Sequence, residues 1–148
     1  MLSFYLPVAV ADEVVAAAVA GRSVHLIGED AGQCWSAMAA LVSGVGARCK
    51  VAGLWDRGGE HPCVVGHERS LSLQVPPEWV PLVARGKVSL GIMLAQHMID
   101  AAVVVDPPAD WGPVLADVVV QRPLWIATPG DRALPAAGDV MTVRLADR

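Results

Sequence analysis

The sequence predicts a three-layer α/β domain built on a mainly parallel, open, Rossmann-like sheet with one or two antiparallel edge strands. Two continuous apolar runs, residues 101–105 and 123–127, are each closed by turn-forming residues. Short apolar runs of this kind are typical of strands that are buried on both faces. A short helical signal separates them, and parallel neighbours need a crossover of this sort. The pair therefore predicts one unit of a parallel sheet.

The N-terminal part predicts a strand and then a helix. Residues 2–10 hold aromatic and β-branched side chains. Pro7 lies in the middle of this run and has no ladder donor, so the strand is expected at an edge or is interrupted there. Residues 12–19 are rich in alanine and begin with two acidic residues, which favours a helix. Gly21 is a suitable stop for that helix.

The next segment predicts a strand, a turn and a helix in succession. Residues 23–27 form an apolar strand, and Asp30 is a favourable N-cap for a helix over residues 31–42. A third strand is expected over residues 49–55. The inner face of the helix is marked by apolar residues at helical spacing, namely Cys34, Met38, Leu41 and Val42.

The middle and the end of the chain are less regular. Residues 69–75 and 140–145 alternate between polar and apolar side chains, which favours half-exposed strands at the edges, antiparallel by preference. Residues 76–85 predict a short helix that tolerates prolines in its first turn. Residues 88–98 fit the start of a strand followed by a helix. No linker or repeat divides the chain, so residues 1–148 are expected to form a single domain.

Composition excludes several classes of protein. The chain has 148 residues and a formal net charge of −4, and its only lysines are Lys50 and Lys87. Nucleic-acid binding needs clustered positive charge and is therefore not expected. No apolar run reaches the roughly 18 residues of a membrane helix, so no membrane contact is predicted. The first residues lack the basic flank of a signal peptide, and three cysteines cannot all pair, which favours a reducing, cytoplasmic location.

The same composition predicts assembly. Hydrophobic residues make up 54% of the chain and charged residues only 18%, whereas about 25% charged residues are usual. Charge cannot cover the whole surface, and the apolar patches that remain usually mark interfaces. We therefore expect a homo-oligomer. A complex with a different protein partner is the alternative.

Candidate site residues follow from the predicted topology, because ligands of open parallel sheets bind at the carboxyl ends of the strands. Polar residues stand at those ends in several places. A carboxylate there can take up a proton or hold a ligand hydroxyl. The catalytic candidates are Asp106, Asp110 and Asp131, and the ligand-binding candidates are Glu29, Asp30, Asp56 and Thr128.

No conventional motif identifies a cofactor or a metal. The turn Gly28-Glu29-Asp30-Ala31-Gly32 lies where a dinucleotide fingerprint would lie, but it lacks that glycine pattern and places two carboxylates where a phosphate would bind. His61, Cys63 and His67 share one segment without completing a four-ligand zinc pattern. The cofactor therefore stays unknown, and no metal site is predicted. Tryptophans near strand ends are expected to line a pocket, anchor a subunit contact or fill the core.

Two functions remain as hypotheses. The first is a small-molecule-binding domain that works as a subunit of an oligomer or larger complex. The second is an enzyme that acts on a nucleoside or another polyhydroxylated ligand through carboxylates at the strand ends. Residues 100–127 are similar in pattern to nucleoside 2-deoxyribosyltransferase-like domains: an apolar strand, an aspartate, a glycine-bearing turn, a short helix and a second strand. The acidic residue in that helix is Asp117, and the family's catalytic glutamate has no clear counterpart there.

Overall fold

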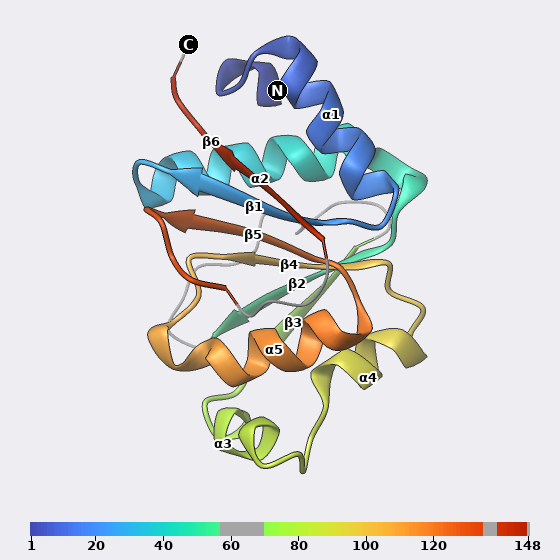
Figure 1. Ribbon diagram of the computed structural model, residues 1–148. Helices are drawn as coiled ribbons and strands as arrows, with labels where there is room; N and C mark the ends of the chain where they lie inside the picture. The colour runs from blue at the N-terminus through green and yellow to red at the C-terminus, as the bar shows by residue number, and fades with distance from the viewer. Residues whose placement is uncertain (57–69, 135–138, 148) are drawn as a thin grey trace.

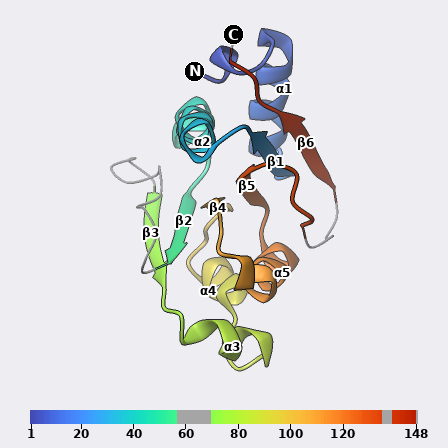
Figure 2. The same ribbon diagram turned by 90° about the vertical axis from the view of Figure 1, so that its left-hand side faces the viewer.

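The computed structural model describes residues 1–56, 70–134 and 139–147, which fold around one six-stranded sheet with helices on both faces (Figures 1 and 2). All strand pairs are parallel, and the strand order is β3-β2-β4-β5-β1-β6. The strands are β1 (Ser23–Gly28), β2 (Val51–Asp56), β3 (Ser70–Val75), β4 (Ala101–Val105), β5 (Leu124–Pro129) and β6 (Val140–Arg144). The helices are η1 (Leu2–Phe4), α1 (Val8–Val19), α2 (Ala31–Val45), η2 (Gly46–Arg48), α3 (Trp79–Ala84), α4 (Leu90–Gln96), η3 (Ala109–Trp111) and α5 (Gly112–Gln121). This confirms the predicted layered α/β architecture.

Two apolar cores lie on opposite faces of the sheet. The first joins η1, α1 and α2 to one face, and the second joins α3, α4 and α5 to the other (Figure 2). Successive side chains of a strand point to opposite faces. Accordingly Val103 belongs to the first core and Val104 to the second, and both are buried. The apolar runs of the central strands are therefore continuous because each strand is covered on both sides.

The two edge strands, β3 and β6, are parallel to their neighbours, so the prediction of antiparallel edge strands is wrong. Ser70 of β3 pairs with Val51, and Val140 of β6 pairs with Ser23, both in parallel register. Most residues of β3 and β6 are half-buried or exposed, as expected for edge strands. Alternation of polar and apolar residues in a sequence indicates that one face of a strand is exposed to solvent. It carries no information about the direction of the neighbouring strand.

The N-terminal strand predicted over residues 2–10 is also wrong, because this segment forms η1 and the first turn of α1. Pro7 is the N-cap of α1, with φ −52° and ψ 144°. A proline immediately before a helix loses nothing, because the first N–H groups of a helix have no partner within it. The helix therefore begins at Val8, earlier than the alanine-rich run suggests, and its first turn contains no acidic residue.

Helix α2 follows the prediction closely and carries the chain from β1 to β2 over β5 and β4. The Asp30 carboxylate accepts a hydrogen bond of 2.8 Å from the backbone N–H of Gln33, which is the predicted N-cap. The strand start expected within residues 88–98 is absent. Instead Ser89 caps α4 by accepting from the N–H of Ile92 at 3.1 Å. Within residues 1–56, 70–134 and 139–147, no helix is both long enough and apolar enough to cross a bilayer.

Candidate functional site

The strand order creates one point where neighbouring strands lead in opposite directions. From the carboxyl end of β2 the chain goes on to β3, on one side, whereas from the carboxyl end of β4 it goes through α5 to β5, on the other side. The strands of Figure 1 all point toward the left-hand edge of the sheet, where these connections diverge. In open parallel sheets, ligands bind outside the carboxyl ends of the strands at such a divergence. The space between β2 and β4 is therefore the first place to look for a site.

A cavity of about 260 Å³ lies at this point. We call it the β2–β4 crevice. Its walls come from the ends of both strands, from the segment that follows β4, and from the first turns of α2. The lining residues are Ala31, Trp35, Leu54, Trp55, Asp56, Val104, Val105, Asp106, Pro107, Pro108 and Trp111. This wall is mainly apolar, with a few polar groups, as is usual for small-molecule sites.

Three tryptophans line the crevice, each from a different element: Trp35 from α2, Trp55 from β2 and Trp111 from η3. The indole Nε1–H of Trp55 donates to the Ser72 hydroxyl at 2.9 Å, which fixes the orientation of that ring. Trp111 is only 2% exposed and packs in the second core. Of the roles left open for tryptophans near strand ends, Trp55 lines a pocket, and Trp111 both lines it and fills the core. Trp125 instead fills the first core.

Two carboxylates, Asp56 and Asp106, also line the crevice. Asp106 has φ +45°, in the left-handed region that aspartate enters more readily than most side chains. Its Oδ1 lies 3.1 Å from Nη2 of Arg132, and Nη1 of the same arginine donates to the Pro107 carbonyl at 2.7 Å. The turn after β4 is thus held in place by the segment after β5, and the Asp106 carboxylate is oriented at the rim.

The remaining predicted site residues share this edge of the sheet but do not line the crevice. Asp30 caps α2, and the backbone N–H of Glu29 donates to Gln33 Oε1 at 2.7 Å. Asp131 forms an ion pair of 3.0 Å with Arg144 of β6. Asp110 is exposed on η3. The structure therefore places Asp56 and Asp106 in one crevice. The other four predicted carboxylates lie around the same edge of the sheet, outside the crevice, and each has different neighbours.

Thr128 is fully buried, and its hydroxyl already has two partners. It donates to the Gly130 carbonyl at 2.7 Å and lies 2.8 Å from Nε2 of His25. Since the hydroxyl proton is used on Gly130, the histidine Nε2 carries a proton and donates to Thr128. Burial lowers the pKa of His25, a change that nearby Asp131 partly opposes. His25 is thus a neutral core residue with a satisfied hydrogen bond, and Thr128 is its partner in β5.

The two described cysteines, Cys34 and Cys49, show no sign of a reactive thiol. Cys34 and Cys49 are free and buried, and burial raises the pKa of both thiols above the ordinary value. The segment with His61, Cys63 and His67 lies outside the described residues. Within the part of the chain that the structure describes, no three histidine, cysteine, aspartate or glutamate side chains gather in a way that would hold a metal ion.

Sequence reasoning missed Trp35 and the Pro107-Pro108 wall. Trp35 lies on the first turns of α2, and its partial exposure places it on the flank of the helix that faces the crevice. The available signal was a tryptophan directly after the buried Cys34, off the apolar stripe of the helix. The sequence matches no known protein-family model and no curated protein. The fold and the crevice therefore define the class of protein: an open, parallel α/β domain with a site where the chain reverses direction across the sheet.

Proposed function

We propose that this chain is a small-molecule-binding α/β domain whose ligand occupies the β2–β4 crevice. The observation that carries the proposal is the coincidence of a cavity with the point where the β2 and β4 connections diverge. Three tryptophans supply apolar contact area there, and Asp56 and Asp106 supply polar anchors. The volume of about 260 Å³ suits a small ligand and not a dinucleotide.

A thermal-shift screen against amino acids, amines, sugars, nucleosides and nucleotides tests this proposal. Ligands that bind only the folded state raise the melting temperature. Ala31 lines the crevice on the exposed first turn of α2, so Ala31→Leu should obstruct it without disturbing the core. Ser36 is exposed one turn further along α2 and is absent from the lining, so Ser36→Leu is the matched control. We expect Ala31→Leu to abolish the shift and Ser36→Leu to keep it.

The pairing of Asp56 and Asp106 in one cavity also favours the second candidate function, an enzyme that acts on a nucleoside or another polyhydroxylated ligand. Two carboxylates in different surroundings can divide acid and base roles. Asp106 is oriented by Arg132, whereas no described residue pairs with the Asp56 carboxylate. If the domain is such an enzyme, product appears on incubation with nucleosides, and Asp106→Asn stops turnover while substrate still raises the melting temperature.

We further propose that the domain is one subunit of a two-fold homodimer. A groove of about 630 Å³ runs between the N-terminal segment and α2, and its lining includes the exposed side chains of Met1 and Val8. Asp12 and Arg48 also line it, and these opposite charges can pair reciprocally across a two-fold axis between two copies. Sedimentation should give twice the 15.5 kDa of one chain.

Val8→Asp tests the same face. Aspartate is compatible with the first turn of α1, so the helix should remain folded. Val120 on α5 is about as exposed, at 73% against 66% for Val8, so Val120→Asp is the control. We expect the Val8→Asp variant to sediment as a monomer and the Val120→Asp variant to sediment as a dimer. Wild-type protein that sediments at 15.5 kDa and does not change on concentration would contradict the dimer.

We also propose a cytoplasmic location. Cys34 and Cys49 are free thiols, which supports a reducing compartment. Fractionation of cells that express the tagged chain tests the location directly.

A further inference from the structure

We infer that the β2–β4 crevice binds a cation, namely a small ammonium group carried on an apolar body; this inference rests on the proposed function. Its three supports are the charge of the crevice wall, the charge of the surrounding edge and the residue types that make up the rest of the wall. Each support comes from a different set of described residues.

The first support is the charge of the wall itself. Among the described residues, the lining includes two carboxylates and no lysine, arginine or histidine. Only Oδ1 of Asp106 is paired, with Arg132, and Oδ2 has no partner among the described residues. The Asp56 carboxylate likewise has no hydrogen bond or ion pair within the described part of the chain. Among the described residues, Arg132 at the rim neutralises one of the two carboxylates, and the crevice wall keeps a net negative charge.

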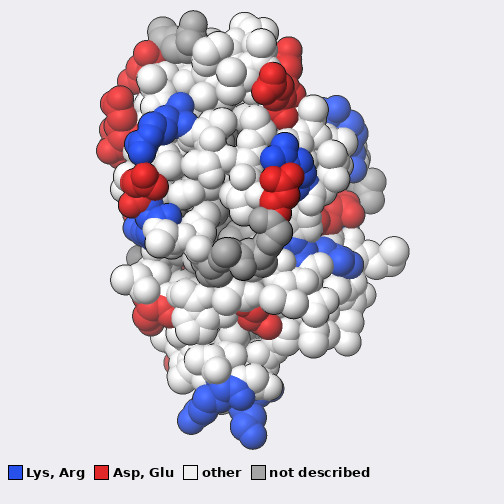
Figure 3. Space-filling model, in the orientation of Figure 1, with Lys and Arg blue, Asp and Glu red and all other residues white. Residues whose placement is uncertain are grey.

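The second support is the edge around the crevice. Glu29, Asp30 and Asp110 are exposed on the segments that flank it, whereas Arg132 and Arg144 are each engaged by an aspartate. Acidic and basic side chains are interspersed along the left-hand edge in Figure 3, the edge to which the strands of Figure 1 point.

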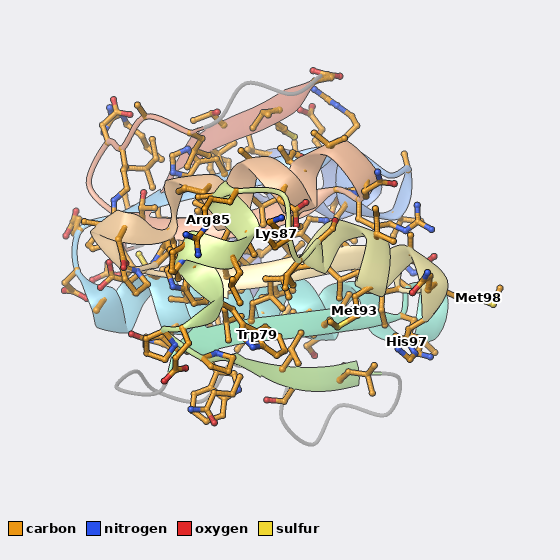
Figure 4. All side chains as sticks on the ribbon, turned by 90° about the horizontal axis from the view of Figure 1, so that it is seen from below. Trp79, Arg85, Lys87, Met93, His97 and Met98 are labelled. Atoms are coloured by element: carbon orange, nitrogen blue, oxygen red, sulfur yellow. The ribbon has the colours of Figure 1, made fainter. Side chains whose placement is uncertain are left out.

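Two exposed basic side chains of the described residues lie elsewhere. Figure 4, seen from below, shows Arg85 and Lys87 at the end of α3, on the helical layer that faces the viewer. Both side chains are exposed. Among the described residues around the crevice, carboxylates outnumber arginines, and this excess of negative charge favours cations over anions. The first turn of α2, which would otherwise suit an anion, already has the Asp30 carboxylate as its cap.

The third support is the aromatic and aliphatic remainder of the wall. Trp35 and Trp55 supply aromatic rings, and cations bind favourably over the faces of tryptophan rings, whereas the buried Trp111 exposes almost none of its ring. The other side chains are aliphatic or proline: Ala31, Leu54, Val104, Val105, Pro107 and Pro108. They offer no side-chain donors for sugar hydroxyls. Apolar groups attached to the cation, such as methyl groups, match this wall better than hydroxyl groups do.

The test uses two isosteric probes, choline chloride and its neutral analogue 3,3-dimethyl-1-butanol. They have the same branched shape and differ in the charge of the central atom. Binding is measured by titration calorimetry and by tryptophan fluorescence at one fixed ionic strength, held with sodium chloride. We expect choline to quench or shift the tryptophan emission and to bind about tenfold more tightly than the alcohol.

Charge-removing variants locate the effect. Asp106→Asn keeps a residue that tolerates the left-handed backbone, and Asp56→Asn keeps the shape of its side chain. Each should weaken choline binding by about fivefold to tenfold and leave the alcohol unchanged. Glu13→Gln removes one negative charge from the exposed surface of α1, outside the crevice, and should leave both affinities unchanged.

The outcomes separate the two claims. If the alcohol binds as tightly as choline, or if both asparagine variants bind choline like the wild type, the inferred preference for a cation is overturned. A different result is that choline does not bind, but a neutral or anionic library compound raises the melting temperature and Ala31→Leu abolishes that rise. The inferred preference for a cation is then wrong, while the proposed binding function is supported. If neither probe binds and no library compound raises the melting temperature, both the inferred preference for a cation and the proposed binding function are wrong.

Discussion

Arg132 forms an ion pair with Asp106 at the rim of the β2–β4 crevice. Nη2 of Arg132 lies 3.1 Å from Oδ1 of Asp106, and Nη1 donates to the carbonyl of the next residue, Pro107, at 2.7 Å. The two contacts tie the segment after β5 to the turn after β4. They hold a residue whose φ of +45° would be unfavourable for most side chains. A carboxylate in a costly backbone conformation at the mouth of a cavity is consistent with a position kept for binding.

The backbone of Asp106 gives the first prediction. Asp106→Gly and Asp106→Ala both remove the carboxylate and its ion pair with Arg132. They differ only in how well they accept φ +45°. Alanine should therefore be less stable than glycine by about 1 kcal/mol in the free energy of unfolding, measured by urea denaturation. Equal stability of the two variants would mean that the left-handed conformation relaxes at no cost.

The buried pair of His25 and Thr128 gives the second prediction. Thr128→Val keeps the shape of the side chain but leaves the Nε2–H of His25 without an acceptor in the core. We expect a loss of about 1–3 kcal/mol in the free energy of unfolding. Thr128→Ser keeps the hydroxyl and removes one methyl group, so its loss should be nearer 1 kcal/mol. A valine variant as stable as the serine variant would show that the hydrogen bond is unimportant.

The third prediction concerns pH. Burial holds the pKa of His25 below its value in the unfolded chain, which is about 6.5. Below pH 6.5 the unfolded chain therefore takes up a proton that the folded chain does not. Stability is complete above that pH and falls as the pH is lowered toward the folded pKa, by up to about 1.4 kcal/mol per pH unit from this group. Chemical denaturation between pH 7.5 and pH 5 (~2.5 pH units) should show this slope, and His25→Leu should reduce it.

Much of the fold was predictable because its central parts obey local rules. The turn at Asp30 combines an apolar strand with a strong N-cap, and residues 101–105 form an apolar run that only a strand covered on both faces explains. Val105 is the exception in that run. It is only half-buried because it lines the crevice.

The unpredicted parts depend on contacts that are distant in sequence. Nothing in residues 69–75 or 140–145 says which strand will be the neighbour, so the parallel pairing of β3 and β6 was not visible. The order of strands also decides that Asp56 meets Asp106, while Asp131 is paired with Arg144. Pro7 is compatible with an edge strand and with a helix N-cap. Packing of η1 and α1 on the first core determines which one forms.

The last prediction concerns the contact between α4 and α5, a close approach that no sequence pattern indicated. The carboxylate of Asp117 on α5 accepts from the Ser89 hydroxyl at 2.8 Å and from the backbone N–H of Gly91 at 3.0 Å, so α5 provides a second cap for α4. A Cβ at Gly91 would lie 2.5 Å from the backbone oxygen of Asp117 and 2.9 Å from Cγ of Gln121. The backbone oxygen cannot rotate away as a flexible side chain can.

Gly91→Ala should therefore force the two helices apart and weaken both hydrogen bonds to Asp117. Overpacking of this kind costs about 1–3 kcal/mol in the free energy of unfolding, more than the gain from the higher helix propensity of alanine. Gly112 begins α5, and a Cβ there meets nothing within 4 Å, so Gly112→Ala is the control and should be neutral or slightly stabilising. Thermal and urea denaturation of the two variants measure this difference in stability. If Gly91→Ala is as stable as Gly112→Ala, α4 and α5 are less closely packed than these distances require, and the Asp117 cap does not fix their approach.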